Sequence, residues 1–410
     1  MLVLVLNAGS SSQKSALFDL PSRTSTDPAR PVWEGRLEWE GNRQTLTSEN
    51  FQGKRVQVSA EIPADERSSS VETMLRGLWT GPVAVVASPG EIRAVGHRIV
   101  HGGPNLSEPV IITADVKRTI REVFDIAPLH NRAGLEGIEL AEKLIPQACQ
   151  AAVFDTGFHR TLPLESLVYP GPYEWYQHGI RRYGFHGISH AYSARRAAEL
   201  VGRKPSALKI VTCHLGNGCS LAAVDAGRSV DTTMGFTPLE GLMMGTRAGS
   251  IDPGILSHLV RTGSARETEL DDILNHRSGL LGISGVSSDM RDVERAAAEG
   301  NERAKLAFAI FVHRLQGGIA SMAASLGGLD ALVFTAGIGE NSASVRRSAC
   351  RGLAFLGVQV DEEKNSSAHP DADISSPDSP VRILVIRAQE DWAIAQASLD
   401  LIRSLQPAAL

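Results

Sequence analysis

Two arginines and two carboxylates are the residues whose surroundings best suit them for chemistry. Arg98 and Arg247 lie in glycine-flanked segments, GHRIVHGG and MGTRAGS, where a guanidinium is better explained as a fork for a carboxylate or phosphate than as a solvated charge. Asp155 follows the apolar run AAVF, and Glu390 comes soon after RILVI. Carboxylates at such strand ends could hold magnesium. The pattern therefore indicates a site for two anionic substrates.

Eight of the twelve histidines fall between His97 and His214, among arginines, aspartates and glycines. Most of them should be satisfied core or turn residues, because that is the common state of a single histidine. A zinc site is an alternative, since His97 and His101, like His186 and His190, are four residues apart. Neither pair carries the Glu of a His-Glu-x-x-His motif and glycine interrupts both segments, so zinc is disfavoured.

Three glycine-rich segments are candidate phosphate or nucleotide loops. Residues 7–12, NAGSSS, precede Lys14, and residues 214–218 read HLGNG. A glycine- and serine-rich turn taken singly is more often only a turn. The third segment, GIGEN at 337–341, follows the strand-like run ALVFTA and is expected to precede a helix beginning near Ser342, whose amides could receive a nucleotide. Its spacing is neither that of a Rossmann fingerprint nor that of a Walker A loop.

The elements that must carry these loops occur twice. LVLVL, NAGSSSQ and KSALFD read as strand, turn and strand, and from residue 209 KIVTC, HLGNGC and SLAAVD repeat the pattern, followed by a strand at RSVDTT. The two copies predict a duplicated α/β fold with a loop at the tip of each hairpin. Apolar periodicity predicts helices near residues 71, 114 and 134, and a core helix over 302–326 in which Gly317 and Gly318 permit close packing. Residues 361–380 are expected to form a surface loop.

Composition excludes several classes of protein. The 410 residues are 42% hydrophobic, enough for two or three domains, and 41 basic against 46 acidic side chains give a net charge of -5. Nucleic-acid and membrane partners are therefore not expected. The four cysteines form no Cys-x-x-Cys pair and are expected to be reduced and buried. The N-terminal apolar run, Leu2 to Leu6, is too short for a signal segment, so we expect a cytoplasmic enzyme.

The order and wording of these segments closely resemble the acetate kinase family of acyl-phosphate-forming kinases over nearly the whole chain. The stretches that carry the resemblance are NAGSSSQK at 7, GHRIVHGG at 96, APLHN at 127, FDTGFH at 154, RRYGFHGISH at 181, CHLGNGCS at 213, DTTMGFTPLEGLMMGTR at 231 and FTAGIGEN at 334. The resemblance implies an α/β, actin-like ATPase fold: two duplicated ribonuclease-H-like domains with the active site in the interdomain cleft, usually paired as a homodimer. The implied domains are 1–150 with 387–410, completed by the C-terminal helix, and 151–386, carrying the nucleotide site.

The resemblance also implies a reaction and its residues: reversible transfer of a phosphoryl group between ATP and acetate, giving ADP and acetyl phosphate, with Mg2+ required and Mn2+ a possible substitute. The implied catalytic residues are Asp155, His186, Arg247 and Arg98, and the metal residues are Asn7 and Glu390. Substrate binding is implied for Arg98 with the apolar pocket residues Val100, Leu129, Phe185 and Pro238. ATP binding is implied for Lys14, His214, Leu215, Gly216, Asn217, Gly218, Asp289, Met290, Arg291, Gly337, Ile338, Gly339, Glu340 and Asn341. Because a carboxylate substrate is already ionised, Asp155 is expected to serve metal and positioning instead of acting as a base.

The sequence departs from the family pattern at several positions. Thr246-Arg247-Ala248-Gly249-Ser250 stands where TRSGD is usual, losing a hydroxyl and a carboxylate beside the arginine. Arg132 to Gly134 replaces Pro-x-Asn, and other changes are Gly157, Ile188 and residues 387–389. These leave propionate or butyrate kinase open as alternatives, and an ATP-binding regulatory module without transfer activity as a rival from another class. A sugar kinase and a metallohydrolase are more distant alternatives.

Overall fold

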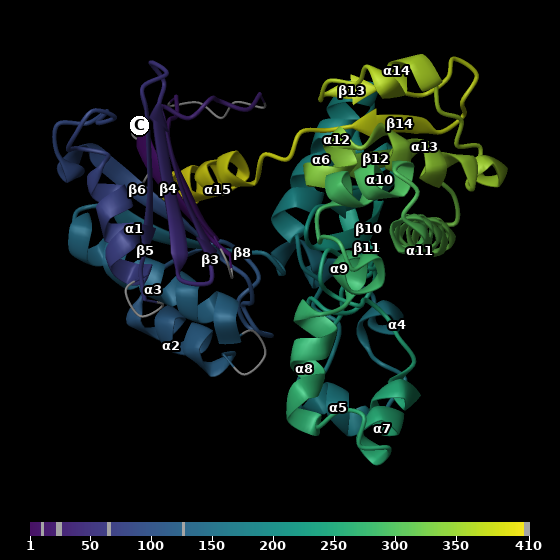
Figure 1. The fold of residues 1–410 in the computed structure, drawn as a ribbon. Helices are drawn as coiled ribbons and strands as arrows, with labels where there is room; N and C mark the ends of the chain where they lie inside the picture. Colours follow the sequence, from purple (N-terminus) through teal and green to yellow (C-terminus); the bar gives the residue numbers. More distant parts are fainter. Residues whose placement is uncertain (10–11, 22–26, 64–66, 125–127, 406–410) are drawn as a thin grey trace. The chain divides into compact units, whose positions relative to one another are not determined.

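The computed structural model describes residues 1–9, 12–21, 27–63, 67–124 and 128–405, without the side chains of residues 40 and 128–130. The chain forms two compact units (Figure 1). The first comprises Met1–Gly157 together with Gln389–Leu410, and the second comprises Phe158–Ala388. The expected boundary after residue 150 falls inside a strand of the first unit, which is why the division lies a few residues later.

The first unit is built on an eight-stranded sheet in the order β5-β4-β3-β2-β1-β6-β8-β7. Its strands are β1 (Leu2–Ala8), β2 (Ser12–Asp19), β3 (Trp33–Glu40), β4 (Arg43–Asn50), β5 (Arg55–Glu61), β6 (Ile92–Ile99), β7 (Val110–Ile111) and β8 (Cys149–Phe154). Strands β1 to β5 pair antiparallel, β1, β6 and β8 run parallel, and β7 pairs antiparallel with β8. The parallel strands are almost continuously buried, as expected for strands covered on both faces.

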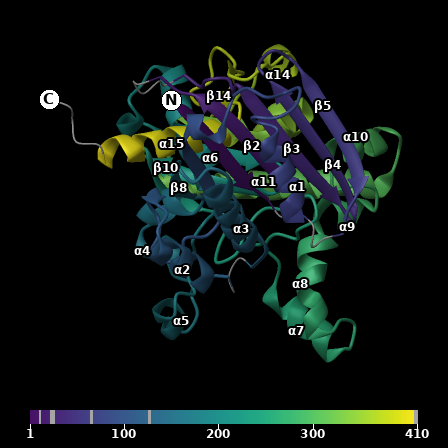
Figure 2. The same ribbon diagram turned by 90° about the vertical axis from the view of Figure 1, so that its left-hand side faces the viewer.

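Helices cover both faces of this sheet (Figures 1 and 2). They are α1 (Arg67–Arg76), α2 (Ala114–Glu122), α3 (Pro128–Leu144) and α15 (Glu390–Leu405). Along β6, Val95 packs in one core cluster with residues of α1 and α3. Its neighbour Gly96 faces α15, because a β-carbon there would meet Ser398 at 2.4 Å. Since successive strand residues point to opposite faces, the odd-numbered residues from Val95 onward face α1 and α3, and the even-numbered residues from Ala94 onward face α15. Ile92, which lies before a shift in the register of β6 with β1, packs in the cluster of α1 and α3.

The second unit repeats the same strand pattern. Its six-stranded sheet has the order β11-β10-β9-β12-β14-β13. The strands are β9 (Lys209–Leu215), β10 (Cys219–Asp225), β11 (Arg228–Thr232), β12 (Ala331–Thr335), β13 (Ala372–Asp373) and β14 (Arg382–Val385). β9, β12 and β14 run parallel, and the other pairings are antiparallel. This matches β3-β2-β1-β6-β8-β7 strand for strand and direction for direction, which confirms the predicted duplication; β4 and β5 are additions to the first copy.

The helices of the second unit are α4 (Leu164–Leu167), α5 (Tyr173–Gln177), α6 (Gly187–Val201), α7 (Pro253–Arg261), α8 (Glu267–His276), α9 (Gly279–Ser284), α10 (Met290–Ala298), α11 (Glu302–Leu326), α12 (Ala336–Asn341), α13 (Ala343–Arg351) and α14 (Glu362–Ser366). The predicted core helix is α11, which begins after the capping side chain of Asn301 and ends at the left-handed Gly327. Within the described ranges it is the one helix long and apolar enough to cross a membrane by length and composition. It packs against the sheet: a β-carbon on Gly318 would meet Leu221 of β10 at 2.7 Å.

Two expectations need correction. Residues 361–380 are not simply a loop, because they contain α14 and β13, and β13 pairs with β14. The helix expected near Ser342 is confirmed as α13, which Ser342 caps, and the segment at 337–341 before it is itself helical, as part of α12. Cys213, Cys219 and Cys350 are free and buried as expected, but Cys149 is only partly buried because it begins the β8 strand at the sheet margin.

Candidate active site

In the first unit, three predicted site residues lie at the ends of the parallel strands and on one face. Arg98 is an even-numbered residue of β6 and therefore faces α15. Asn7 is the last residue but one of β1, and its neighbour Leu6 packs in the core cluster of α1 and α3. Asp155 follows Phe154, which packs on the α2 and α3 side. Strand alternation thus explains why Asn7, Arg98 and Asp155 share the α15 face at the carboxyl edge of the sheet.

Arg98 and Asp155 form a buried ion pair. Nη2 of Arg98 donates to Oδ2 of Asp155 at 2.7 Å, and the two side chains are 13% and 0% exposed. Nη1 also reaches the carbonyl of Ala8 at 3.4 Å. Burial lowers the pKa of Arg98, but the carboxylates of Asp155 and Glu390 outweigh it and the net pKa is raised. Arg98 is therefore a permanent cation held in place by Asp155, which accords with a positioning role for that carboxylate.

Sequence reasoning missed Asp391, which joins this group. Nδ2 of Asn7 donates to Oδ1 of Asp391 at 2.8 Å. Burial raises the pKa of Asp391, while the hydrogen bond from Asn7 and the charge of Lys14 lower it. Asp391 could have been predicted from its position directly after Glu390, in the first turn of α15. Lys14 is exposed and lies opposite Asn7 in the β1–β2 register.

The oxygen donors here are of the kind that a magnesium ion takes, although the three carboxylates are not arranged around one point in the described residues. The amide oxygen of Asn7 and the carboxylates of Asp155, Glu390 and Asp391 are the oxygen ligands that Mg2+ prefers, and Mg2+ usually takes only one or two carboxylates beside water and phosphate oxygens. The amide nitrogen of Asn7 is turned to Asp391, so its oxygen points elsewhere. Ser10 and Ser11 of the first loop lie outside the described residues.

In the second unit, His186 is held by a chain of hydrogen bonds. Nδ1 of His186 lies 2.9 Å from Oγ of Ser220, and that oxygen lies 2.7 Å from Nε2 of the buried His190. Nδ1 of His190 lies 2.7 Å from Oγ1 of Thr212. Burial lowers the pKa of His190 well below its ordinary value, so this ring stays neutral. His186 itself has φ 56°, an uncommon left-handed conformation at the residue that precedes α6.

The loop between β9 and β10 brings His186 and Arg247 together. The rings of His186 and His214 stack with centroids 4.1 Å apart, and Nδ1 of His214 lies 2.8 Å from Oγ of Ser189. A β-carbon on Gly218 would lie 3.3 Å from Nε2 of His186 and 3.5 Å from Nη1 of Arg247. Glycine at this position leaves both side chains facing one small space beside the loop.

Arg247 differs from Arg98 in its partners. Its Nη1 donates to the carbonyl of Pro238 at 3.3 Å and approaches Sδ of Met244 at 3.8 Å. Burial lowers its pKa, and in the described part of the chain it forms no ion pair with a carboxylate. Because withdrawing a guanidinium from water without a counter-ion is costly, this partly buried arginine is suited to an anion that arrives from solution.

The side chains of Glu340 and Asn341, two residues predicted to bind adenosine, form hydrogen bonds to nearby backbone groups. Glu340 accepts hydrogen bonds from the backbone N–H groups of Ala388 at 2.8 Å and Ala336 at 3.1 Å, and burial raises its pKa. Nδ2 of Asn341 donates to the carbonyl of Gly337 at 2.8 Å. These side chains stabilise α12 itself, so contact with a nucleotide at Gly337 to Gly339 would fall to the backbone.

A second adenosine segment begins α10. The carboxylate of Asp289 caps this helix and pairs with the exposed Arg291, while Met290 is buried. Asn217 is held against Gly245, where a β-carbon would lie 2.1 Å from its Oδ1, and its carbonyl accepts from the N–H of Gly245 at 3.0 Å.

The apolar pocket residues divide between the units. Val100 is buried in the first unit, and Phe185, with Pro238 half-buried, lies in the second. Leu129 lies in the first turn of α3, but its side chain is outside the described residues. The carbonyl of Phe185 lies 3.1 Å from Nε2 of His159.

The zinc alternative finds no support in these contacts. Nε2 of His97 lies 2.8 Å from Oε1 of Gln150, and Nδ1 of His101 accepts from the N–H of Gly103 at 2.8 Å. His186 and His190 bond to Ser220. Throughout the residues that the structure describes, no group of three or more His, Cys, Asp or Glu side chains is arranged to hold a metal ion together.

Known proteins match the chain along nearly its whole length. The model of the Acetokinase family matches residues 2–396. The acetate kinases of a Cyanothece strain and a Nostoc strain are each 54% identical to the chain over 404 residues, covering 98% of it and 99% and 100% of those proteins. The solved acetate kinase of Porphyromonas gingivalis matches with a TM-score of 0.89 at 39% identity, over 98% of this chain and 99% of that one. A propionate kinase from Francisella tularensis matches with a TM-score of 0.87, also at 39% identity, over the same shares.

The duplicated sheets, the glycine-containing loop beside His186 and Arg247 and these matches define a kinase with the actin-like ATPase fold. The chain belongs to the acetokinase family.

Proposed function

We propose that the chain is an acetate kinase, which transfers a phosphoryl group reversibly between ATP and acetate and depends on Mg2+, with Mn2+ as a substitute. The observation that carries the proposal is Arg247, which is partly buried beside Gly218 and His186 and has no carboxylate partner among the described residues. Such a guanidinium suits the charge that develops on the oxygens of a transferring phosphoryl group. The names of the Cyanothece and Nostoc relatives support acetate as the acceptor.

In this mechanism an acetate oxygen forms a bond to the γ-phosphorus of ATP while the bond from that phosphorus to the β,γ-bridging oxygen breaks, and ADP leaves. Acetate enters as the anion, so no residue has to remove a proton from it. Arg98 binds the carboxylate, and Asp155 holds the guanidinium in place. Arg247 and His186 stabilise the oxygens of the phosphoryl group in flight.

The residues around the nucleotide and the metal have supporting roles. Asn7 and Glu390, with Asp391, would hold Mg2+, which when bound neutralises charge on the phosphates. Lys14 and the loop His214 to Gly218 would contact the phosphates. Residues Asp289 to Arg291 and Gly337 to Asn341 would bind the adenosine part of ATP. Val100, Leu129, Phe185 and Pro238 would enclose the methyl group of acetate. We further propose a cytoplasmic homodimer, whose subunit number light scattering at micromolar concentration would test.

The test traps acyl phosphate with hydroxylamine. Purified protein receives MgATP with acetate, propionate, butyrate or no acid, and parallel samples contain EDTA. We expect hydroxamate with acetate leading, and none with EDTA. A propionate lead would favour the activity named for the Francisella structure. If none of the three acids gives hydroxamate while the protein still binds ATP, the result would point to the regulatory module.

A further inference from the structure

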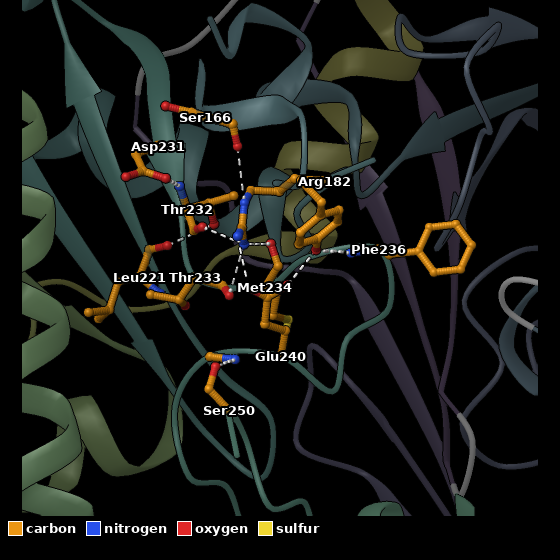
Figure 3. Close-up of polar contacts among 12 residues, drawn as sticks. Ser166, Arg182, Leu221, Asp231, Thr232, Thr233, Met234, Phe236, Glu240 and Ser250 are labelled. Atoms are coloured by element: carbon orange, nitrogen blue, oxygen red, sulfur yellow. Dashed lines mark hydrogen bonds and ion pairs between the residues drawn. The ribbon is translucent and has the colours of Figure 1, made fainter. Parts of the chain in front are cut away.

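All three nitrogens of the Arg182 guanidinium donate hydrogen bonds, and most of these bonds go to the segment of residues 232–240 (Figure 3). Nη1 donates to three successive carbonyls, those of residues 232–234, at 3.1, 3.2 and 3.1 Å. Nη2 donates to Oε1 of Glu240 at 2.8 Å, and Nε donates to the carbonyl of Ser166 at 3.2 Å. Because the guanidinium is a rigid plane, this one side chain fixes both the beginning and the end of the segment 232–240.

Tyr169 closes the same arrangement from the other side. Its hydroxyl donates to Oε2 of Glu240 and accepts from the N–H of Phe236 at 2.8 Å. The guanidinium carbon of Arg182 lies 5.4 Å from the centre of the Tyr169 ring. Burial raises the pKa of Tyr169, and the bond to Glu240 raises it further, so the phenol remains a donor at neutral pH. We call Tyr169, Arg182 and Glu240 the loop clamp.

Gly235 shows how closely the loop clamp surrounds the segment. A β-carbon on Gly235 would lie 1.7 Å from Oε2 of Glu240 and 2.0 Å from the hydroxyl of Tyr169. The carbonyl of Gly235 also accepts from the N–H of Tyr183 at 3.0 Å. The backbone of the segment is therefore held from both sides by hydrogen bonds and direct contact.

The clamped segment carries Pro238, one of the residues proposed to enclose the acid, and contacts a second site residue, Arg247. Pro238 lies between Phe236 and Glu240, and its carbonyl accepts from Nη1 of Arg247 at 3.3 Å. Beyond the segment, the N–H of Gly241 donates to Oγ of Ser250 at 3.0 Å, and the N–H of Ser250 donates to the carbonyl of Gly241 at 2.9 Å. Ser250 thus supplies an acceptor where the family usually has a carboxylate. A shift of the segment would move Pro238 and the guanidinium of Arg247 together.

We propose that the loop clamp is a set of positioning residues for the acid substrate: it fixes the place of Pro238 and the orientation of Arg247, and through them the preference for a short acyl chain. This inference rests on the proposed function. A clamp that served stability alone would lower the melting temperature and leave the preference among acids unchanged. A positioning clamp changes the KM for the acid and the selectivity between acids more than the KM for ATP.

The decisive variant is Tyr169→Phe, which removes one oxygen atom, with Tyr173→Phe as the matched control at an exposed tyrosine. The hydroxamate assay gives kcat and KM for acetate, propionate and ATP. Loss of the bonds to Glu240 and Phe236 should raise the KM for acetate about three- to tenfold, in line with the net effect of one or two hydrogen bonds. The ratio of kcat/KM for propionate to that for acetate should rise at least about threefold on the same grounds, with the KM for ATP within twofold.

Two further variants test the other two residues of the loop clamp, so the result does not depend on Tyr169→Phe alone. Glu240→Gln retains the shape but turns an N–H2 group toward one partner, and Arg182→Lys retains the charge but loses the fork. Both should shift acid selectivity in the same direction as Tyr169→Phe, while Tyr173→Phe stays at the wild-type ratio. Calorimetry on each variant separates loss of fold from loss of positioning.

Unchanged acetate KM and acid selectivity in folded Tyr169→Phe overturn the inference while leaving the proposed function intact. Equal rises in the KM for acid and for ATP overturn it as well. Wild-type protein that forms no hydroxamate with any acid instead removes the proposed function, and this inference with it.

Discussion

Nδ1 of His186 lies 2.9 Å from Oγ of Ser220. Ser220 is bonded in turn to the neutral His190, so the serine hydroxyl links a buried, uncharged ring to the ring at the site. If Thr212 accepts from His190, then His190 accepts from Ser220 and Ser220 accepts from His186. This direction places a proton on Nδ1 of His186 and turns Nε2 toward the space beside Gly218 and Arg247.

Ser220→Ala should therefore lower kcat more than it raises KM for either substrate. Loss of the anchor frees the His186 ring to rotate, and a cost near that of one hydrogen bond corresponds to about a tenfold drop. Ser193→Ala is the matched control, because Ser193 is a buried serine of α6, the helix that carries His190. Steady-state kinetics of both variants check this, and equal effects of the two would contradict the assignment.

Arg247→Ala should lower kcat and kcat/KM together. A guanidinium that acts mainly on the charge developing in transfer contributes little to binding of the ground state. We expect a loss of about a hundredfold or more, the usual result of removing such a donor. Arg98→Ala provides the comparison and should mainly raise the KM for acetate. A near-normal kcat in Arg247→Ala would exclude the proposed role.

Asp155→Asn should strongly reduce turnover and alter its dependence on Mg2+. The substitution leaves the buried Arg98 without its counter-ion and removes one anionic oxygen from the group that suits a metal. Titration of activity against Mg2+ at saturating acetate and ATP measures the change. Near-normal turnover with the wild-type Mg2+ dependence would mean that Asp155 has neither function.

His97 should make folding less favourable in acid. Burial lowers its pKa from 6.5 to about 4, against a smaller raising effect of its bond to Gln150. The unfolded chain therefore takes up a proton between pH 6.5 and 4 that the folded chain does not, so the contribution of neutral His97 is present above pH 6.5 and is lost as the pH falls. The loss should reach about 3 kcal/mol near pH 4.

His97→Gln should remove this part of the pH dependence. Urea unfolding of both proteins at pH 7 and near pH 4.5 measures the difference between their stability losses. Identical losses on acidification would show that the histidine titrates alike in the folded and unfolded chain.

Two adjacent glycines of α11 should respond in opposite ways to alanine. A β-carbon on Gly318 would meet Leu221 at 2.7 Å, whereas one on Gly317 would find nothing within 4 Å. Gly318→Ala should destabilise the protein by about 1–3 kcal/mol through overpacking. Gly317→Ala should stabilise it by about 0.5–1 kcal/mol through helix propensity. Thermal unfolding checks both, and matching signs would refute the packing described for α11.

Local sequence signals were sufficient for much of the fold. The period of 302–326 predicted α11 with its bounds, and the two hairpins predicted β1 with β2 and β9 to β11. The short β13 was not predictable, because two residues form a strand only through pairing with β14. The boundary after residue 150 came from the family resemblance, because nothing local assigns β8 to the first sheet.

The site was predictable where type and setting coincide, and not where partners are distant in sequence. Arg98 and Asp155 were chosen for their settings, and the structure joins them. Asp391 was missed because its partner Asn7 is at the other end of the chain. Arg182 was missed because its role depends on bonds to three backbone carbonyls. Every residue has a backbone carbonyl, so no sequence pattern marks these three.

The placement of α15 has a consequence for synthesis on the ribosome. The first unit is translated early, but the helix that covers the face of β6 and brings Asp391 to Asn7 is translated only after the entire second unit. Domains ordinarily fold in the order in which they emerge. One face of the first sheet therefore stays uncovered until α15 has been translated. Glu390 and Asp391 are translated last, so a chain interrupted before α15 would lack these carboxylates and would not be an active enzyme.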